Sequence, residues 1–157
     1  MLQQKAPVLT TVLSEVLANL AFMFTDDESA EPSPGDVWLE TTISYRGPAQ
    51  GTLKFRCPKD FSHLLAANLL GVDPQNENAE SKGEDAAREF MNILCGQLIT
   101  SLHGAEEVFD LSIPQSNEMS EMPDLSVEEG PESVTMSVEG YRVQLAYLPS
   151  AEEPAAP

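Results

Sequence analysis

The sequence predicts an α+β fold, a two-layer sandwich with an antiparallel-rich sheet covered on one face by two long helices. Residues 7–24 and 85–103 each carry apolar side chains at helical spacing on one face only. Five other segments are interpreted as strands, in the order helix–strand–strand, short helix, helix–strand–strand–strand, which is a weak internal repeat. Because each long helix has a single apolar face, both need a sheet to pack on.

Length and charge limit the class of protein. With 157 residues, 41% of them apolar, the chain can bury one core, and we expect a single domain over residues 1–150 with a disordered tail over 151–157. The net charge of −18 argues against a nucleic-acid partner. No apolar run approaches the roughly 20 residues that span a membrane. Glu15 and Asn19 interrupt the apolar start, which therefore indicates a helix and a cytoplasmic protein.

The first half of the chain begins with the helix over residues 7–24. An acidic, proline-rich loop over residues 25–35 follows it. Residues 37–46 and 51–57 then alternate in polarity and should pair as an antiparallel hairpin. The expected buried face of the helix comprises Leu9, Val12, Leu13, Val16, Leu17, Leu20 and Phe24, and one side of the first strand carries Val37, Leu39, Thr41, Ile43 and Tyr45.

The second half begins with a short helix over residues 59–70, opened by Pro58 and closed by Gly71. A polar linker over residues 72–85 leads into the central helix. Strands are expected over residues 107–114, 133–140 and 141–148, with a tight turn at Gly140. Residues 115–132 lack periodicity, which predicts a mobile surface loop.

The central helix, residues 85–103, is the most informative segment. At about 100° per residue its side chains separate into two arcs. The apolar arc comprises Ala87, Phe90, Met91, Leu94, Leu98 and Leu102, and the polar arc comprises Asp85, Glu89, Asn92, Gly96, Thr100 and His103. Glu89 and Asn92 are three residues apart and therefore lie side by side. Gly96 costs about 1 kcal/mol of helix propensity, which indicates that the polar face must be approached closely.

The segment Glu89-Phe90-Met91-Asn92-Ile93-Leu94-Cys95-Gly96 resembles the ExxN-(apolar)-x-x-G helix of the CheC/CheX/FliY phosphatases of bacterial chemotaxis. Its single good copy points to CheX-like members. The segments FRCPKDFSHLLAANLLG and FDLSIP resemble the family's strand-then-helix ending in LG and its strand ending in proline, so the resemblance covers most of the chain. It implies the same two-layer fold and a homodimer formed through sheet edges.

The resemblance also implies a reaction and a role for each site residue. The substrate would be the aspartyl-phosphate of a receiver protein, usually CheY, and the receiver would supply Mg²⁺, so that this chain needs no cofactor. Asn92 would position the attacking water, as a glutamine does in small GTPases. Glu89 would pair with the active-site lysine of the receiver. Gly96 would leave room for the receiver.

The first helix carries a degraded copy of the same motif. Glu15 is present, but the residue three positions later is Ala18, and Asn19 follows one position further on the same face as Glu15. Glu15 and Asn19 therefore form a candidate secondary site. Phe22 on that face is interpreted either as a docking aromatic or as a cap on the sheet edge.

The remaining chemistry-bearing residues have structural interpretations. His63 is expected at the surface, and His103 as a cation at the C-terminus of its helix. Cys57 and Cys95 are expected as free thiols in the core. The acidic runs at residues 26–28 and 152–153 are interpreted as solvated surface, and no metal site is expected.

The function predicted in this way is a CheX-like phosphatase acting on a phosphorylated response regulator. A rival hypothesis is a non-catalytic module that docks on a receiver or resembles a flagellar-switch adaptor. A structural dimer without a receiver partner is disfavoured by the polar arc of Glu89, Asn92 and Gly96. The sequence does not identify which receiver is used.

Overall fold

The structure is a computed structural model that describes residues 5–25, 37–71, 73, 82–119 and 132–149. Its helices are α1 (Lys5–Ala21), α2 (Lys59–Leu70) and α4 (Gly83–His103). Its strands are β1 (Trp38–Arg46), β2 (Gly51–Pro58), β3 (Asp110–Leu111), β4 (Gln115–Met119), β5 (Glu132–Val138) and β6 (Tyr141–Pro149). Nearly all of the predicted loop over 25–35, most of the polar linker, the tail and both acidic runs lie outside the described residues.

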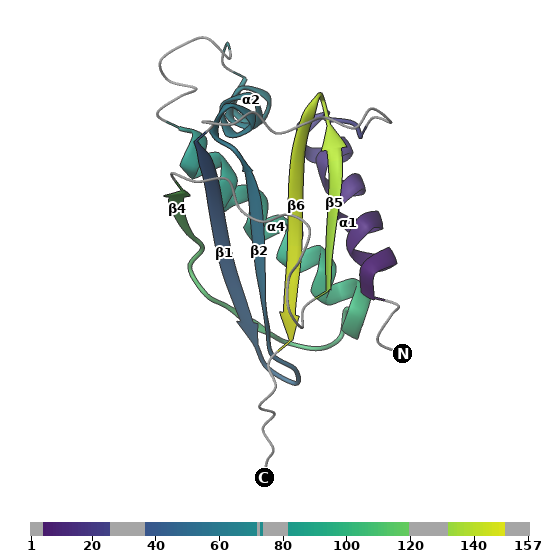
Figure 1. The fold of residues 1–157 in the computed structure, drawn as a ribbon. Coiled ribbons are helices and arrows are strands. Elements are labelled where there is room, and N and C mark those ends of the chain that lie inside the picture. Colours follow the sequence, from purple (N-terminus) through teal and green to yellow (C-terminus); the bar gives the residue numbers. More distant parts are fainter. Residues whose placement is uncertain (1–4, 26–36, 72, 74–81, 120–131, 150–157) are drawn as a thin grey trace.

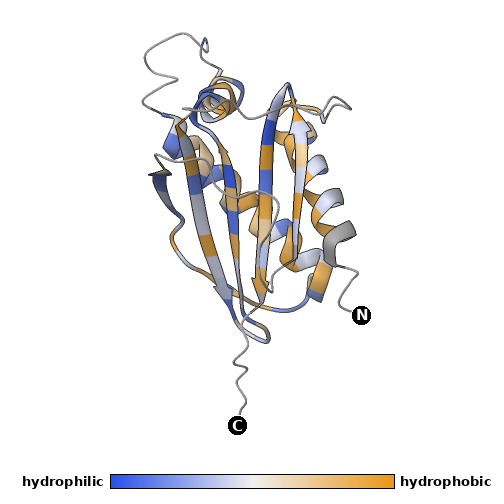
Figure 2. Cartoon of the chain, viewed as in Figure 1, coloured by the Kyte–Doolittle hydropathy of each residue, from blue (hydrophilic) through white to orange (hydrophobic). Residues whose placement is uncertain are grey.

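The described strands form one antiparallel sheet in the order β3-β1-β2-β6-β5, and β4 also pairs with β1. β1 and β2 form the predicted hairpin, in which Ile43 lies opposite Leu53. Along the outer side of β1, β3 pairs with the end of the strand and β4 with its beginning. Figure 2 shows apolar and polar residues alternating along the strands, as expected for a sheet with two different faces.

The helices lie together on one face of this sheet (Figure 1). Their apolar sides meet the sheet in one core, so the predicted two-layer α+β fold is confirmed. The ring of Phe55 on β2 contacts the rings of Phe61 on α2 and Phe90 on α4, at centroid distances of 6.1 and 5.2 Å. Fully buried core residues include Leu9, Leu13 and Leu17 of α1, Phe90, Leu94 and Leu98 of α4, and Ile43, Leu53 and Phe55 of the sheet.

The contact between α2 and the start of α4 sets the position of the central helix. A Cβ atom added to Gly83 would lie 2.7 Å from Ser62 Oγ and 3.3 Å from Cδ2 of His63, so only glycine allows this close approach. His63 was expected at the surface but is only partly exposed, with 19% of its side chain accessible. It is covered by the packing of α2 against α4.

The end of α1 also differs from the prediction. The helix stops at Ala21, and Phe22 has a left-handed φ of 55°. The backbone of Phe24 then binds the turn between β5 and β6, donating its N–H to Glu139 Oε2 at 2.9 Å and accepting the Glu139 N–H at 3.3 Å. Phe24 was expected on the buried face but is 57% exposed, because the chain has left the helix to make these bonds.

The outer side of β1 holds the largest correction. Residues 107–114 were expected as a strand, but only Asp110–Leu111 pairs with β1. Of the loop expected over residues 115–132, residues 115–119 form β4, and residues 120–131 lie outside the described part of the chain. Without β4 the backbone N–H and C=O groups of β1 would be unpaired there, and a mostly polar segment can satisfy them as well as an apolar one. Val37, expected on the buried side of β1, precedes the strand and is exposed.

The sheet face opposite the helices carries a polar cluster across three strands. Glu40, Arg56 and Gln144 lie at paired positions of β1, β2 and β6. Arg56 donates from Nε to Glu40 Oε2 and from a terminal guanidinium nitrogen to Gln144 Oε1, both at 2.8 Å. Because Arg56 and Gln144 are buried, these bonds satisfy groups that would otherwise be costly to bury.

Candidate active site

Helix α4 is built to present one polar face. Glu84 and Asp85 lie in its first turn and His103 in its last, which complements the helix dipole at both ends. Arg88 makes an ion pair with Asp85 and a second one with Glu84, at 3.7 Å. The predicted apolar arc is buried except for Leu102, which is partly exposed. The opposite arc therefore faces away from the sheet, except at its end, where the ring of His103 lies 6.2 Å from that of Tyr45 on β1.

Glu89 and Asn92 are both exposed on this outer arc. Neither side chain makes a hydrogen bond or ion pair with another described residue, and the neighbouring Arg88 is engaged by other carboxylates. Both groups are therefore available to a partner that approaches α4. The structure brings these two predicted site residues together, as their spacing requires.

Gly96 lies one turn beyond Asn92 and is partly exposed. A Cβ atom added there would meet nothing within 4 Å beyond its chain neighbours and the backbone of its own helix. The local backbone therefore has no internal packing need for glycine, in contrast with Gly83. The open space beside Gly96 agrees with the prediction that this face of α4 is approached closely.

Glu15 and Asn19 are exposed on α1, and they line a groove between α1 and α4. Ile93 and Gln97 of α4 form the other wall, so the groove adjoins the face that carries Asn92 and Gly96. Gln97 was not singled out from the sequence. The sequence shows only that Gln97 is a polar residue on the exposed side of α4. That it faces α1 depends on the packing of the two helices, which no local pattern reveals. The groove is lined by Val12, Glu15, Val16, Asn19, Leu20, Ile93 and Gln97.

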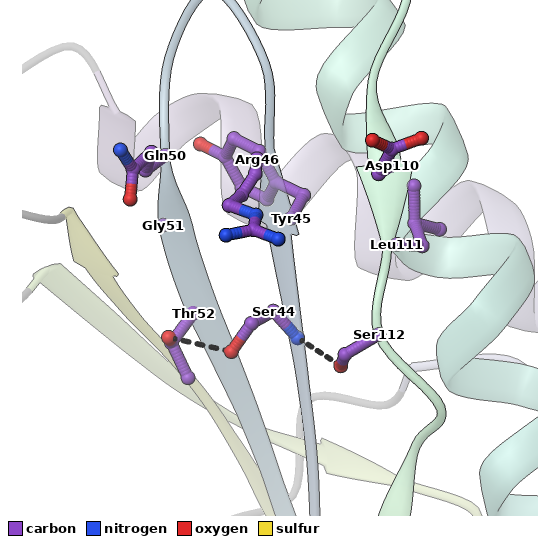
Figure 3. A pocket seen from close by; sticks show the side chains of 9 residues that line it. All are labelled: Ser44, Tyr45, Arg46, Gln50, Gly51, Thr52, Asp110, Leu111 and Ser112. Carbon is purple, nitrogen blue, oxygen red and sulfur yellow. Dashed lines mark hydrogen bonds between the residues drawn. The ribbon is translucent and has the colours of Figure 1, made fainter.

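A second cavity lies in the sheet itself, where β1, β2 and β3 meet (Figure 3). It has a volume of about 410 Å³. Hydrogen bonds join its hydroxyl groups to the strands: Ser44 Oγ lies 2.9 Å from Thr52 Oγ1, and Ser112 Oγ accepts the Ser44 N–H at 2.9 Å. These hydroxyl groups therefore already bind one another, and the charged residues at the cavity are Arg46 and Asp110, which lie opposite each other on β1 and β3. It is lined by Ser44, Tyr45, Arg46, Gln50, Gly51, Thr52, Asp110, Leu111 and Ser112.

The cysteines and His103 provide no competing site. Cys57 and Cys95 are buried and form no disulfide, which confirms the prediction of free core thiols. Burial raises the pKa of the Cys95 thiol to about 12 and also raises the pKa of Cys57, so neither is a nucleophile at neutral pH. His103 ends α4, where its ring lies 5.2 Å from that of Phe109. Among the described residues, no group of three or more His, Cys, Asp or Glu side chains could hold a metal ion.

Comparison with solved structures shows where this fold occurs elsewhere. A chemotaxis protein CheX from Desulfovibrio desulfuricans matches with a TM-score of 0.66 and 17% identity, over 92% of this chain and 98% of that chain. CheX from Vibrio vulnificus matches with a TM-score of 0.65 and 18% identity, over 91% and 97%. A CheX–CheY–BeF3–Mg²⁺ complex from Borrelia burgdorferi matches with a TM-score of 0.61 and 19% identity, over 91% and 96%.

At these identities the likeness shows the fold alone. No curated protein matches the sequence. Within the described part of the chain, no helix is long and apolar enough to cross a membrane. The sequence itself matches the family model described as chemotaxis phosphatase CheX over residues 40–137, which is more than half of the chain and includes all of α4. The chain therefore belongs to the CheX family of chemotaxis phosphatases.

Proposed function

We propose that this protein hydrolyses the aspartyl-phosphate of a CheY-type response regulator. The proposal rests on the pair Glu89 and Asn92, which are exposed on the outer face of α4. Neither side chain bonds to another described residue, and the chain belongs to the CheX family. The Borrelia burgdorferi complex of a CheX with CheY supports a CheY-type partner. A response-regulator partner in turn implies a cytoplasmic location.

The proposed mechanism relies on the position of a water molecule. An aspartyl-phosphate is already a reactive acyl phosphate, and its hydrolysis needs a water in line with the phosphorus atom. The Asn92 carboxamide both donates and accepts hydrogen bonds, so it can hold that water in one orientation. Because the carboxamide is uncharged, it does not repel the phosphoryl group. The receiver would supply the Mg²⁺, and this chain would position the attacking water.

Glu89 has a different role in this mechanism. It lies three residues before Asn92, so its carboxylate can reach a lysine beside the phosphoryl group while Asn92 faces the water. A carboxylate and an ammonium group form a charge-assisted hydrogen bond, which orients the two proteins. Glu89 therefore acts by docking.

The activity is tested by phosphate release. A phosphorylated CheY-type receiver from the same cell is mixed with this protein, and the rate of phosphate release is compared with that of the receiver alone. Faster release supports the proposal. Binding without faster release would favour the adaptor hypothesis, in which the chain docks on a receiver but does not promote hydrolysis.

Replacement of Glu89 tests the docking role. Glu89→Ala should weaken receiver binding by about 10-fold and make the remaining affinity less dependent on salt, because one charge pair is lost. Titration of the receiver at low and high ionic strength measures both effects. Glu107→Ala removes another exposed carboxylate, in the segment between α4 and β3, and serves as the control. If Glu89→Ala changed neither affinity nor turnover, Glu89 would be ordinary surface charge.

We also propose a homodimer, formed through the sheet edge made by β3 and β4. Val108 just before β3 and Ile113 between β3 and β4 are 81% and 82% exposed, and edge strands offer unpaired backbone groups to a second chain. The parent protein should sediment as a dimer. Ile113→Lys should sediment as a monomer with an unchanged circular dichroism spectrum, because the exposed side chain contributes little to folding. A parent protein that sediments as a monomer would contradict this proposal.

A further inference from the structure

We infer that the groove between α1 and α4 is a docking pocket for the same receiver, holding one of its apolar side chains beside the phosphorylated aspartate. This inference rests on the proposed function. It assigns Glu15 and Asn19 to the binding of the substrate protein. The candidate secondary site on α1 is then part of the recognition of the receiver.

The groove has an apolar floor and a polar rim. Four aliphatic side chains, Val12, Val16, Leu20 and Ile93, line it together with the exposed polar residues Glu15, Asn19 and Gln97. Its volume of about 230 Å³ is below the roughly 300–1,000 Å³ typical of small-molecule sites. Its size and lining therefore suit a single apolar side chain of a protein partner.

The groove is continuous with the proposed catalytic face. Glu89, Ile93 and Gln97 recur every four residues and so form one ridge along α4. Ile93 directly follows Asn92, and Gln97 directly follows Gly96, where the surface is open. Ile93 lies one turn beyond Glu89, so a protein docked on Glu89 lies beside this wall of the groove. This continuity identifies the receiver as the occupant.

The arrangement on α1 is unlike that of the catalytic pair. Ala18 occupies the position at which the motif has its asparagine. Asn19 is the next residue, so its side chain points about 100° further around the axis of α1. Asn19 lies on the rim of the groove across from α4, whereas Asn92 lies on the outer face of its helix. Glu15 lines the pocket, and Glu89 lies one helical turn before Ile93 of its other wall, so the surface that includes both carries two acidic groups. A cationic surface around the receiver's lysine would complement them.

The inference is tested by separating KM from kcat in the dephosphorylation of a CheY-type receiver. Asn19→Trp should fill the groove without removing a core contact, and Glu15→Lys should reverse the charge of its rim. Each should raise KM about 10-fold and leave kcat within about twofold, because docking is weakened and the water position is kept. Glu107→Lys makes the same charge change outside the groove and should leave KM unchanged. Thermal melts of the variants confirm that they are folded.

The outcomes distinguish this inference from the proposed function. If Asn92→Ala lost turnover while Asn19→Trp and Glu15→Lys kept the parent KM, the docking pocket would be wrong and the proposed function would stand. If residual turnover of Asn92→Ala were abolished by adding Asn19→Ala, α1 would carry a second catalytic site instead. If the parent protein neither bound nor dephosphorylated any receiver from its own cell, both proposals would fail.

Discussion

Asn92→Ala is expected to fold like the parent protein and to dephosphorylate the receiver about 10²–10³ times more slowly, the scale seen when one positioned polar group is removed from an active site. The fold should be unaffected because Asn92 is exposed and alanine favours helix. Receiver binding should change little, since Glu89 and the groove remain. Turnover should fall because the water is no longer held in line with the phosphorus.

Stopped-flow or phosphate-release kinetics on the phosphorylated receiver measure this effect. Asn92→Asp should be similarly slow, because a carboxylate would face the phosphoryl oxygens. Asn117→Ala removes an exposed carboxamide from β4 and should retain the parent rate. Parent-like turnover of Asn92→Ala would place the water-positioning role on another residue, with Asn19 the first to test.

Leu94→Ala is expected to lower the free energy of unfolding by about 2–5 kcal/mol, as for other fully buried leucines. Leu94 is fully buried in the core on the side of α4 that faces the sheet. The substitution removes apolar surface from the core and leaves a cavity that the packed sheet cannot close. Because Leu94 lies on the arc opposite the proposed site, the protein that remains folded should keep the parent kcat.

Urea or thermal unfolding followed by circular dichroism measures the loss of stability. Phe24→Ala removes an apolar side chain that is 57% exposed and lies away from the proposed dimer edge, so it serves as the control and should change stability by less than about 1 kcal/mol. If Leu94→Ala melted like the parent protein, the assignment of the buried face of α4 would be wrong.

The elements predicted correctly are those whose local sequence pattern favours the same structure that tertiary packing requires. The hairpin of β1 and β2 follows from the alternation of its residues, and α2 from the punctuation by Pro58 and Gly71, whose φ of 73° closes the helix. The segments predicted wrongly are governed by distant partners. β4 is polar except for Met119 and becomes a strand because it pairs with β1, and Phe24 leaves α1 because its backbone bonds to Glu139. The single-domain boundaries and the disordered tail stay predictions.

For the candidate site, the sequence by itself determined the pair Glu89 and Asn92 and the open position at Gly96. These residues lie on one helix, where spacing alone decides which side chains share a face. Only the tertiary structure decided that Glu15 and Asn19 share a groove with Ile93 and Gln97. The two walls of that groove are more than 70 residues apart in the sequence. They meet because α1 and α4 must both bury their apolar faces on one sheet, a constraint that no local pattern records.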